Sequence, residues 1–518
     1  MLGRVSPQGS LLAPDQLFPQ LVSKGSFYER LAAVGPELIS DDDFAAMYAQ
    51  VMGRPSIPPS LMMRALLLQT RDKTSDRESA RRSRVDLDWK MALGLPADHP
   101  GIGATTISLF RARVVLHDAD QALFRKTVRK AVEAKLFPRK VLGLIDSSPV
   151  LGAGALSDTY ELVRRAIAQV VRSVGEDQLS KALRRLLKRY LKDTKPDIDW
   201  GNPGARRAEL HRMVAASRRL LAAVADRPEA ARPAALLGAV VDQDVEIDPD
   251  TGEPRIRRGV APDRIVSVTD PEMRHGRKSQ SRRFDGHKLH LIEEESTEIV
   301  LAVDVGPGNG SDGDHAASLV EQAEEAGVRV AELVGDMAYG DGDTRAEVEA
   351  VGARVVAKVP PATNAGYFAK TEFTIDPGTP SATCPAGNTT TDARRTTDHK
   401  GRATAYVVFD ERTCAACPLR PRCVKGRGGR TITLNVHEDR LIKARAEVLR
   451  PAVKRKLRRR AVIERKIDHL QDLGAKKARY RGRRKTKLQA FLAATVANLT
   501  RLDLLGAFGP EEMELVAA

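Results

Sequence analysis

The sequence is poor in aromatic residues and has no long apolar run, and each shortage excludes a class of protein. Aromatic residues make up only 4% of the 518 residues, which argues against a single-strand binder built on stacking platforms. No run approaches about 18 consecutive apolar residues, so the sequence predicts no transmembrane helix and no membrane partner. The first residues lack both a long apolar stretch and a small-residue cleavage site. We therefore expect no signal peptide and a cytoplasmic protein.

Cysteine is also scarce, and its four positions are clustered. Cys384, Cys414, Cys417 and Cys423 all fall within one window of 40 residues. A secreted disulfide framework spreads its cysteines more evenly, whereas a tight cluster in a reducing compartment is typical of metal binding. Four thiolates suit one structural Zn²⁺, which would hold together a Gly- and Pro-rich segment with little core of its own. The alternative is four reduced thiols.

Positive charge is what the chain has in excess. It holds 84 Lys and Arg against 68 Asp and Glu, a net charge of +16, and this balance favours a polyanionic partner, nucleic acid before membrane. Residues 451–487 contain 16 of these cations and only three acids. A basic run is usually a solvated helix face. Here the like charges would repel along the helix, and bound nucleic acid would relieve that repulsion while releasing counterions.

The composition changes along the chain, and these changes predict its organisation. We expect an N-terminal helical DNA-binding domain at 1–138, a catalytic core at 139–151 and 262–360, a helical insertion at 152–261, a β-rich insertion with the four cysteines at 361–437, and C-terminal helices at 438–518. Residues 99–114 have the outline of a helix-turn-helix, although most such pairs bind nothing. Residues 438–475 are expected to form one long helix.

The core segments alternate between strand and helix patterns. Residues 141–145 form a continuous apolar run, long enough for a buried strand that Pro149 would end. A hairpin (287–292 and 298–305), a helix (311–327), a strand (328–336), a short helix from 343 and a last strand (354–359) follow. This order predicts a mixed α/β fold, with helices on the faces of one sheet.

Three acids stand out in this arrangement. Asp146 and Asp336 lie at the ends of two predicted buried strands, and Glu464 lies among the cations of the basic helix. Phosphodiester chemistry commonly uses two divalent cations about 3.5–4 Å apart, held by carboxylates, and hard oxygen ligands suit Mg²⁺ or Mn²⁺. The alternatives are simpler. An Asp after a strand often caps a turn, and a Glu in a basic helix is often half of an ion pair.

With these motifs in order, the chain resembles a bacterial insertion-sequence transposase of the DDE type, with an RNase H-like catalytic core. The resemblance rests on Asp146 in LIDSSPV, Asp336 in LVGDMAYGD and Glu464 in RRRAVIERKIDHL, with a β-rich insertion before the Glu. It implies that these three acids are catalytic and hold two Mg²⁺ or Mn²⁺ ions. It covers residues 15 to 505, and the helical stretch 152–260 carries none of the motif residues.

The resemblance also suggests residues that contact DNA. Related transposases carry Tyr-x2-Arg-x3-Glu-x6-Lys around the catalytic Glu; this chain keeps Arg460 and Glu464 but has Leu457 and Gln471 at the other two positions. Arg460 is expected to steady Glu464 or to contact phosphate. The further DNA-binding candidates come from the basic stretch before the second core strand and from the C-terminal segment: Arg277, Lys278, Arg282, Arg283, Lys476, Lys477, Arg479, Arg481, Arg483 and Arg484.

The activity that follows is DNA transposition. The enzyme would cut double-stranded DNA at the terminal inverted repeats of its element, free a 3′-OH and join it to target DNA in the nucleoid. Pairing two ends makes a homodimer on DNA the natural assembly. Two alternatives remain open: a catalytically silent DNA-binding regulator derived from such an enzyme, and a metal-dependent nuclease on the same core.

Overall fold

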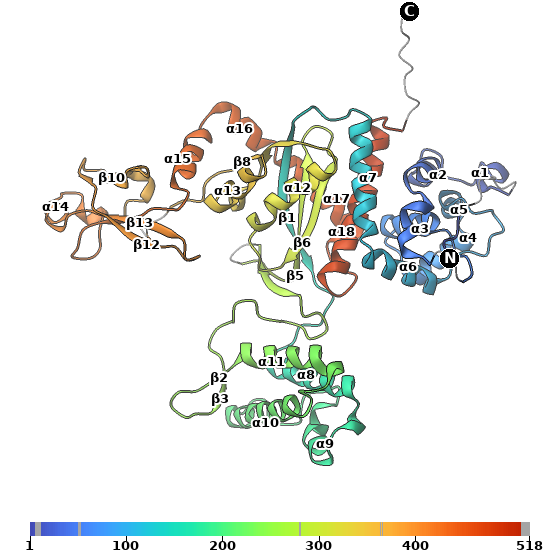
Figure 1. Ribbon diagram of the computed structural model, residues 1–518, viewed down its shortest axis with the longest axis horizontal. Coiled ribbons are helices and arrows are strands. Elements are labelled where there is room, and N and C mark those ends of the chain that lie inside the picture. The colour runs from blue at the N-terminus through green and yellow to red at the C-terminus, as the bar shows by residue number, and fades with distance from the viewer. Residues whose placement is uncertain (6–11, 50–52, 279–280, 363, 365, 509–518) are drawn as a thin grey trace, which may run out of the picture.

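The computed structural model describes the whole chain except residues 6–11, 50–52, 279–280, 363, 365 and 509–518. A central sheet with its helices lies between the N-terminal helices on one side and a β-rich arm on the other, and the helical insertion lies beyond one end of the sheet (Figure 1). The predicted fold class, mixed α/β with these additions, is confirmed. The residues at which we divided the chain into domains stay a prediction.

The central sheet is mixed and has six strands. They are β1 (Val141–Leu151), β4 (Arg274–Arg277), β5 (Arg283–Glu294), β6 (Val300–Pro307), β7 (Val330–Val334) and β8 (Arg354–Val356). The order β6-β5-β1-β7-β8 has β5 antiparallel to β6 and β1, and β7 parallel to β1 and β8. Strand β4 pairs with the first residues of β5. This is the expected RNase H-like sheet, and its central strand begins with the apolar run predicted at residues 141–145.

Strand β1 is longer than the sequence indicated. The prediction that Pro149 ends it is wrong, because β1 pairs with β5 as far as Leu151 and Pro149 lies opposite Lys288. Proline removes a donor from a sheet and is tolerated at an open edge. On its other side β1 pairs with β7 only as far as Leu144. The missing N–H of Pro149 therefore costs no ladder bond there.

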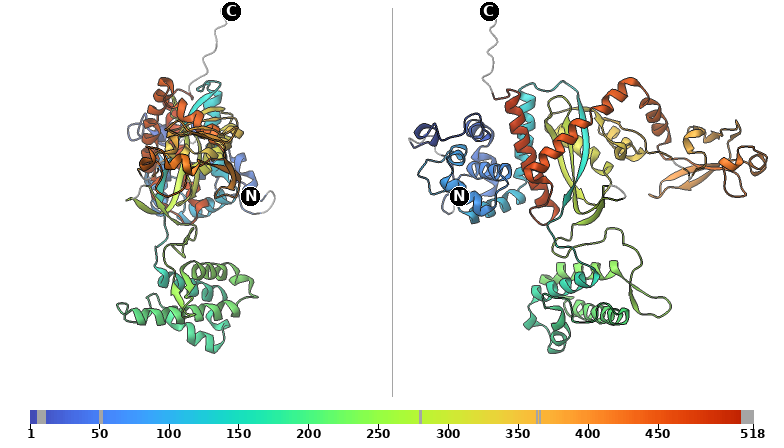
Figure 2. Two further views of the ribbon diagram at one scale, coloured as in Figure 1. Left: turned by 90° about the vertical axis from the view of Figure 1, so that its left-hand side faces the viewer. Right: turned by 180° about the vertical axis from the view of Figure 1, so that it is seen from behind.

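Helices cover both faces of the sheet. Helix α12 (Ala316–Glu325) lies on one face, and α17 (Ala461–Leu470) and α18 (Arg483–Leu504) lie on the other (Figures 1 and 2). The buried Asn498 of α18 accepts a hydrogen bond from the backbone N–H of Val300 and donates to the Val300 carbonyl, at 2.9 Å each. It also donates to Thr127 Oγ1 at 3.0 Å. One amide thus joins α18 to the sheet and to α7 (Ala119–Glu133).

The N-terminal part is all helical, as predicted. Its other helices are α1 (Pro14–Leu17), α2 (Phe27–Leu38), α3 (Pro59–Arg71), α4 (Asp76–Val85), α5 (Leu87–Leu93) and α6 (Ala104–Leu116). Every residue of α3 from Pro59 to Gln69 is buried, so this helix is the centre around which the others pack. Arg111 of α6 donates to Asp76 of α4 at 3.1 Å, which fixes these two helices together.

The helical insertion leaves the sheet after β1 and has a hydrophobic core of its own. It contains α8 (Thr159–Val174), α9 (Lys181–Leu187), α10 (Pro203–Ala223) and α11 (Ala231–Asp244). After α11 the chain forms a short hairpin, β2 (Val245–Ile247) with β3 (Pro254–Ile256). Buried side chains of these helices, such as Ile167, Met213 and Leu237, pack only within the insertion's cluster.

The β-rich arm holds two small sheets. One is formed by β9 (Thr374–Asp376), β10 (Ser381–Thr383) and β11 (Thr389–Thr390), and the other by β12 (Ala393–Thr397), β13 (Ala403–Val408) and β14 (Thr431–Thr433). A short helix, α14 (Glu411–Ala415), precedes the last strand. All six strands lie within the segment predicted to be β-rich, residues 361–437.

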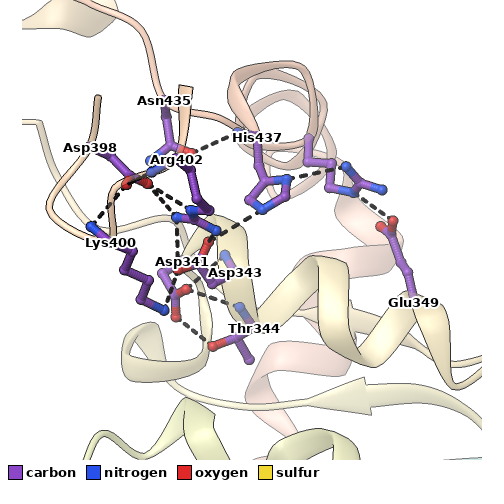
Figure 3. Close-up of polar contacts among 10 residues, drawn as sticks. Asp341, Asp343, Thr344, Glu349, Asp398, Lys400, Arg402, Asn435 and His437 are labelled. Carbon is purple, nitrogen blue, oxygen red and sulfur yellow. Dashed lines mark hydrogen bonds and ion pairs between the residues drawn. The ribbon is translucent and has the colours of Figure 1, made fainter. Parts of the chain in front are cut away.

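An ion-pair joint connects this arm to the core (Figure 3). Asp343, in the first turn of α13 (Gly342–Ala350), accepts hydrogen bonds from Lys400 and Arg402 of the arm, at 2.7 Å each. The imidazole of His437 lies 3.3 Å from the same carboxylate. The Arg402 and Lys400 side chains hold the pKa of Asp343 at about 2. The joint therefore stays charged across the physiological pH range.

The expectation of one helix over 438–475 is wrong. The segment forms α15 (Glu438–Glu447), α16 (Pro451–Arg458) and α17, followed by a π-helical turn at Gln471–Ala475. Pro451 cannot continue a helix that precedes it, so it starts α16 instead. A second break at Arg459 and Arg460 starts α17 in a new direction, and Arg459 bonds to Glu295 at the β5–β6 turn.

Arg484 ties the last helix to the N-terminal helices. It donates two hydrogen bonds to Asp120, whose side chain is fully buried, and one to Asp118. We expect Arg484→Ala to lower the free energy of unfolding by about 2–3 kcal/mol, because it leaves a buried carboxylate unpaired. The matched control is Arg483→Ala, since Arg483 pairs with the half-exposed Glu272 and should cost under about 1 kcal/mol. Equal midpoints of urea unfolding for the two variants would contradict this role for Arg484.

Candidate active site

The three acids singled out in the sequence line one cavity of about 390 Å³. Leu144 of β1 lies beside Val334 of the parallel strand β7, and Asp146 and Asp336 each follow two residues later. Because both acids lie two residues beyond the paired residues Leu144 and Val334 of parallel strands, they lie side by side at the same end of the sheet. Glu464 reaches the cavity from α17. The other lining residues are Ser147, Pro149, Arg277, Lys278, Phe284, Lys288, Asp312, Arg460, Ile467, Asp468 and Gln471.

Asp146 is largely buried in the floor of this cavity. Its carboxylate accepts a hydrogen bond from the backbone N–H of Ser147 at 2.8 Å and lies 3.5 Å from the guanidinium of Arg460. Burial raises the pKa of Asp146 to about 6, and the nearby Asp336 adds to this rise while the Ser147 N–H and Arg460 oppose it. A carboxylate in this position gains from any additional cation that comes close to it.

Asp336 also caps a turn and Glu464 also forms an ion pair, which are the simpler roles considered for these acids from the sequence. Asp336 caps the 3₁₀ turn Met337–Tyr339, accepting from the Ala338 N–H at 2.8 Å. Glu464 pairs with Arg460 at 3.3 Å, and its side chain is 61% exposed. Arg460 thus lies between two of the three acids. The cap fixes Asp336, whereas, within the described residues, Glu464 is held only by its ion pair with Arg460.

The four positions that correspond to the family's Tyr-x2-Arg-x3-Glu-x6-Lys spacing do not lie on one helix. Leu457 belongs to α16, while Arg460 precedes α17 and Gln471 begins the π-helical turn. Gln471, which stands where the signature has Lys, donates to the Ser148 hydroxyl of β1 at 2.8 Å. This hydrogen bond fixes α17 against the strand that carries Asp146.

Asp312, Lys288 and Tyr339 also belong to the site and were not predicted from the sequence. Asp312 lines the cavity and pairs with Lys288 at 2.8 Å. Tyr339 is fully buried, and a Cβ on Gly335 would approach its ring to 2.8 Å and the Ile145 side chain to 3.0 Å. The ring therefore lies against the two segments that carry Asp146 and Asp336. The only signal in the sequence was the aromatic residue in GDMAYGD.

The Tyr339 hydroxyl is buried and accepts or donates no hydrogen bond among the residues that the structure describes. Burial raises its pKa well above the usual value, and the negative charges of Asp312, Asp146 and Asp336 raise it further. A polar atom without a partner is costly in a protein interior. Here it lies close to three carboxylates.

The basic residues predicted to contact DNA have different surroundings. Arg277 and Lys278 line the cavity. Arg282, Arg283, Lys476, Lys477 and Arg481 are exposed. The remaining three bind acids of the chain itself: Arg479 lies 3.5 Å from Asp76, Arg483 pairs with Glu272, and Arg484 pairs with Asp118 and Asp120. Their side chains therefore connect parts of the fold.

The four cysteines gather in the arm, where they line one small cavity of about 20 Å³. The Gly387 N–H bonds to the Cys384 carbonyl at 2.9 Å, so the chain turns tightly after the first cysteine. Burial raises the pKa of the Cys423 thiol, and the other three thiols lie close enough to raise it further. In the described part of the chain, no group of three or more His, Cys, Asp or Glu side chains is arranged to hold a metal ion.

Two family models match this chain. Residues 17–113 match a family described as a transposase domain (DUF772), and residues 383–503 match a transposase DDE domain. The matches indicate an insertion-sequence DDE transposase. The comparisons with curated proteins and with solved structures gave no match. The first match covers α2 to α6 of the transposase, and the second covers Glu464 and the four cysteines. Asp146 and Asp336 lie outside both, so their assignment rests on the geometry.

The transposase has no helix, within its described residues, that combines the length and hydropathy of a bilayer-spanning segment. Its longest helices, α10 and α18, carry charged residues along their length.

Proposed function

We propose that this transposase cuts DNA at the ends of its own element and joins the freed 3′-OH to target DNA. The observation that carries the proposal is the meeting of Asp146, Asp336 and Glu464 at one cavity of an RNase H-like sheet. Two-metal phosphodiester chemistry commonly uses ions held by carboxylates, and here two acids lie just beyond the paired residues of neighbouring parallel strands and a third comes from a late helix. The two matches to transposase families support the same activity.

The three acids offer the type of ligand that Mg²⁺ or Mn²⁺ prefers, and metal binding would have to draw their carboxylates together, since no three such side chains are arranged to hold a metal ion in the described residues. All three acids offer hard oxygen ligands, and the buried Asp146 lacks a full counter-charge because Arg460 is 3.5 Å away and shared with Glu464. Asp146 would contact two ions, and Asp336 and Glu464 would hold one each. Two such ions activate a water molecule and stabilise the attacking and leaving oxygens.

The surrounding residues then have distinct tasks. Arg277, Lys278 and Arg460 present positive charge to the phosphate backbone at the cavity wall. Gln471 holds α17 against β1, so the distance between Glu464 and Asp146 depends on the Gln471–Ser148 hydrogen bond. Tyr339 is a positioning residue, whose hydroxyl donates to one of the neighbouring carboxylates in the DNA-bound state.

The test uses purified protein and a duplex that carries one end of the element. With Mg²⁺, we expect cleavage at the end and a strand-transfer product with a target duplex. Binding without cleavage would support the silent regulator, and cleavage without strand transfer would support the nuclease. Joint transfer of two ends, with two chains in the active complex by sedimentation, would support the homodimer.

A structural zinc in the arm is a separate proposal. The four thiols line one cavity and are soft ligands of the kind that Zn²⁺ prefers, and zinc binding would have to draw them together, since they are not arranged around a metal position in the structure. We expect about one zinc per chain by elemental analysis, and loss of that zinc in Cys417→Ser together with a lower melting temperature of the arm. The control is Thr413→Ser, because Thr413 lies beside Cys414 but has no thiol to bind zinc. A zinc-free wild type with the melting temperature of Cys417→Ser would show that the four cysteines are reduced thiols without a metal.

A further inference from the structure

Helix α9 has a basic face that the rest of the described chain leaves uncompensated. Lys181, Arg184 and Arg185 of α9 and Lys188, which directly follows the helix, are all exposed. Lys181 is three and four residues before the two arginines, and Lys188 is four and three residues after them. That spacing places them on one side of the helix. On the opposite side, Leu183 and Leu187 are buried in the core of the insertion. The face is therefore fixed outward by the packing of the helix.

Within the part of the chain that the structure describes, these four side chains form no ion pair and no hydrogen bond. The sequence contains no acid from residue 180 to residue 192. Some other arginines of the insertion are paired: Arg165 bonds to Glu161, and Arg189 bonds to Glu209. Among the described residues, the insertion's other arginines without such partners are spread over α10, α11 and the segment after β3, whereas the four cations of this face lie within eight residues of the chain.

Like charges at these spacings destabilise a helix. No acid of the described chain forms an ion pair with them, whereas a polyanion would relieve the repulsion and would release its counterions. The face lies at the end of the insertion that points away from the sheet (Figures 1 and 2). Double-stranded DNA is stiff over about 150 base pairs, so a duplex held at the candidate active site continues well beyond it.

We infer that the α9 face, Lys181, Arg184, Arg185 and Lys188, binds the phosphate backbone of double-stranded DNA. This gives the helical insertion a role as a second DNA-binding surface, apart from the cavity of the three acids. Binding there would be independent of sequence, because phosphates carry no base information. The inference rests on the proposed function for the identity of the polyanion.

The test compares two variants with four substitutions each. The α9 variant replaces all four residues of the face by Ala, which preserves helix propensity. The control variant makes the same change in net charge at exposed cations on other faces of the insertion, Arg207, Arg218, Arg219 and Arg232. Both proteins are assayed at full length for binding to a duplex of random sequence without metal, at several salt concentrations.

We expect the α9 variant to bind about tenfold more weakly or worse, and the slope of log K against log salt to fall by about 0.9 for each phosphate that the variant no longer neutralises. The control should keep the wild-type slope within about one unit. Equal weakening in both variants, or unchanged binding by the α9 variant, would overturn the inference. A change in oligomeric state by sedimentation without a change in salt slope would overturn it too, in favour of an interface between copies of the chain.

The two proposals can fail separately. Wild-type protein that cleaves the duplex, together with an α9 variant that binds like wild type, would refute DNA binding by the α9 face alone. Wild-type protein that binds with the α9-dependent slope but never cleaves would refute the proposed chemistry and leave the α9 inference standing.

Discussion

Asp146→Asn should abolish excision and insertion together. With the gene placed beside its own flanking DNA in cells, we expect both events to fall by at least about 10³-fold, because several kcal/mol of metal-dependent stabilisation are lost. The amide keeps the size of the side chain and its hydrogen bond from Ser147. Asp472→Asn is the control, since Asp472 is exposed near α17 and does not line the cavity. Breaks that survive Asp146→Asn would place the active site elsewhere.

The same variant should not lose stability. The folded-state pKa of Asp146 is about 6, above the ordinary value of an Asp, so ionising it costs the folded state free energy as the pH rises from about 4 to about 6. In EDTA at about pH 8, the free energy of unfolding of Asp146→Asn, measured with urea, should therefore equal that of wild type or exceed it by up to about 1–3 kcal/mol. At about pH 4 the difference should vanish. A variant that is less stable than wild type under the alkaline condition would show that Asp146 supports the fold.

Tyr339→Phe should separate stability from activity. Its hydroxyl has no partner among the described residues, so its removal should leave the free energy of unfolding unchanged or raise it by up to about 1 kcal/mol. A hydrogen bond to a charged group contributes about 1.5–3 kcal/mol, so end cleavage should slow by about tenfold or more. The reason is the loss of a donor that orients a carboxylate.

Tyr190→Phe is the matched control for Tyr339→Phe. Tyr190 is equally buried but lies in the core of the helical insertion, so the rate of end cleavage should not change. The decisive quantity is the Mg²⁺ concentration at half-maximal rate, which should rise for Tyr339→Phe alone. An unchanged cleavage rate and Mg²⁺ dependence would show that the Tyr339 ring has only a structural role and that its hydroxyl does not orient a carboxylate.

The sequence predicted the parts of the site that depend on local patterns. The apolar run before Asp146 and the strand before Asp336 could be found because each is a short continuous segment. Because each acid follows one of these strands, the pattern also indicated that the two carboxylates could lie near one another. Glu464 was found through its contrast with the surrounding cations and through the resemblance to a family.

What could not be predicted depends on pairs that are distant in the sequence. Nothing near Arg484 shows that its partner is Asp120, which lies 364 residues earlier. The absence of partners for the Tyr339 hydroxyl among the described residues is equally a property of packing. Pro149 misled us because the rule against proline applies to paired edges, and the sequence does not show that β1 has an open edge beyond Leu144.

The path of the chain into and out of the helical insertion has an evolutionary consequence. The two stems run together, joined where the Ser157 N–H meets the Val266 carbonyl, and the helices between them pack on their own core. A segment attached at two adjacent points, with its own core, can be lost, lengthened or exchanged while the strand that carries Asp146 keeps its register. The position after β1 is thus a point in the gene where a different domain could replace this one while the residues of the candidate active site keep their places.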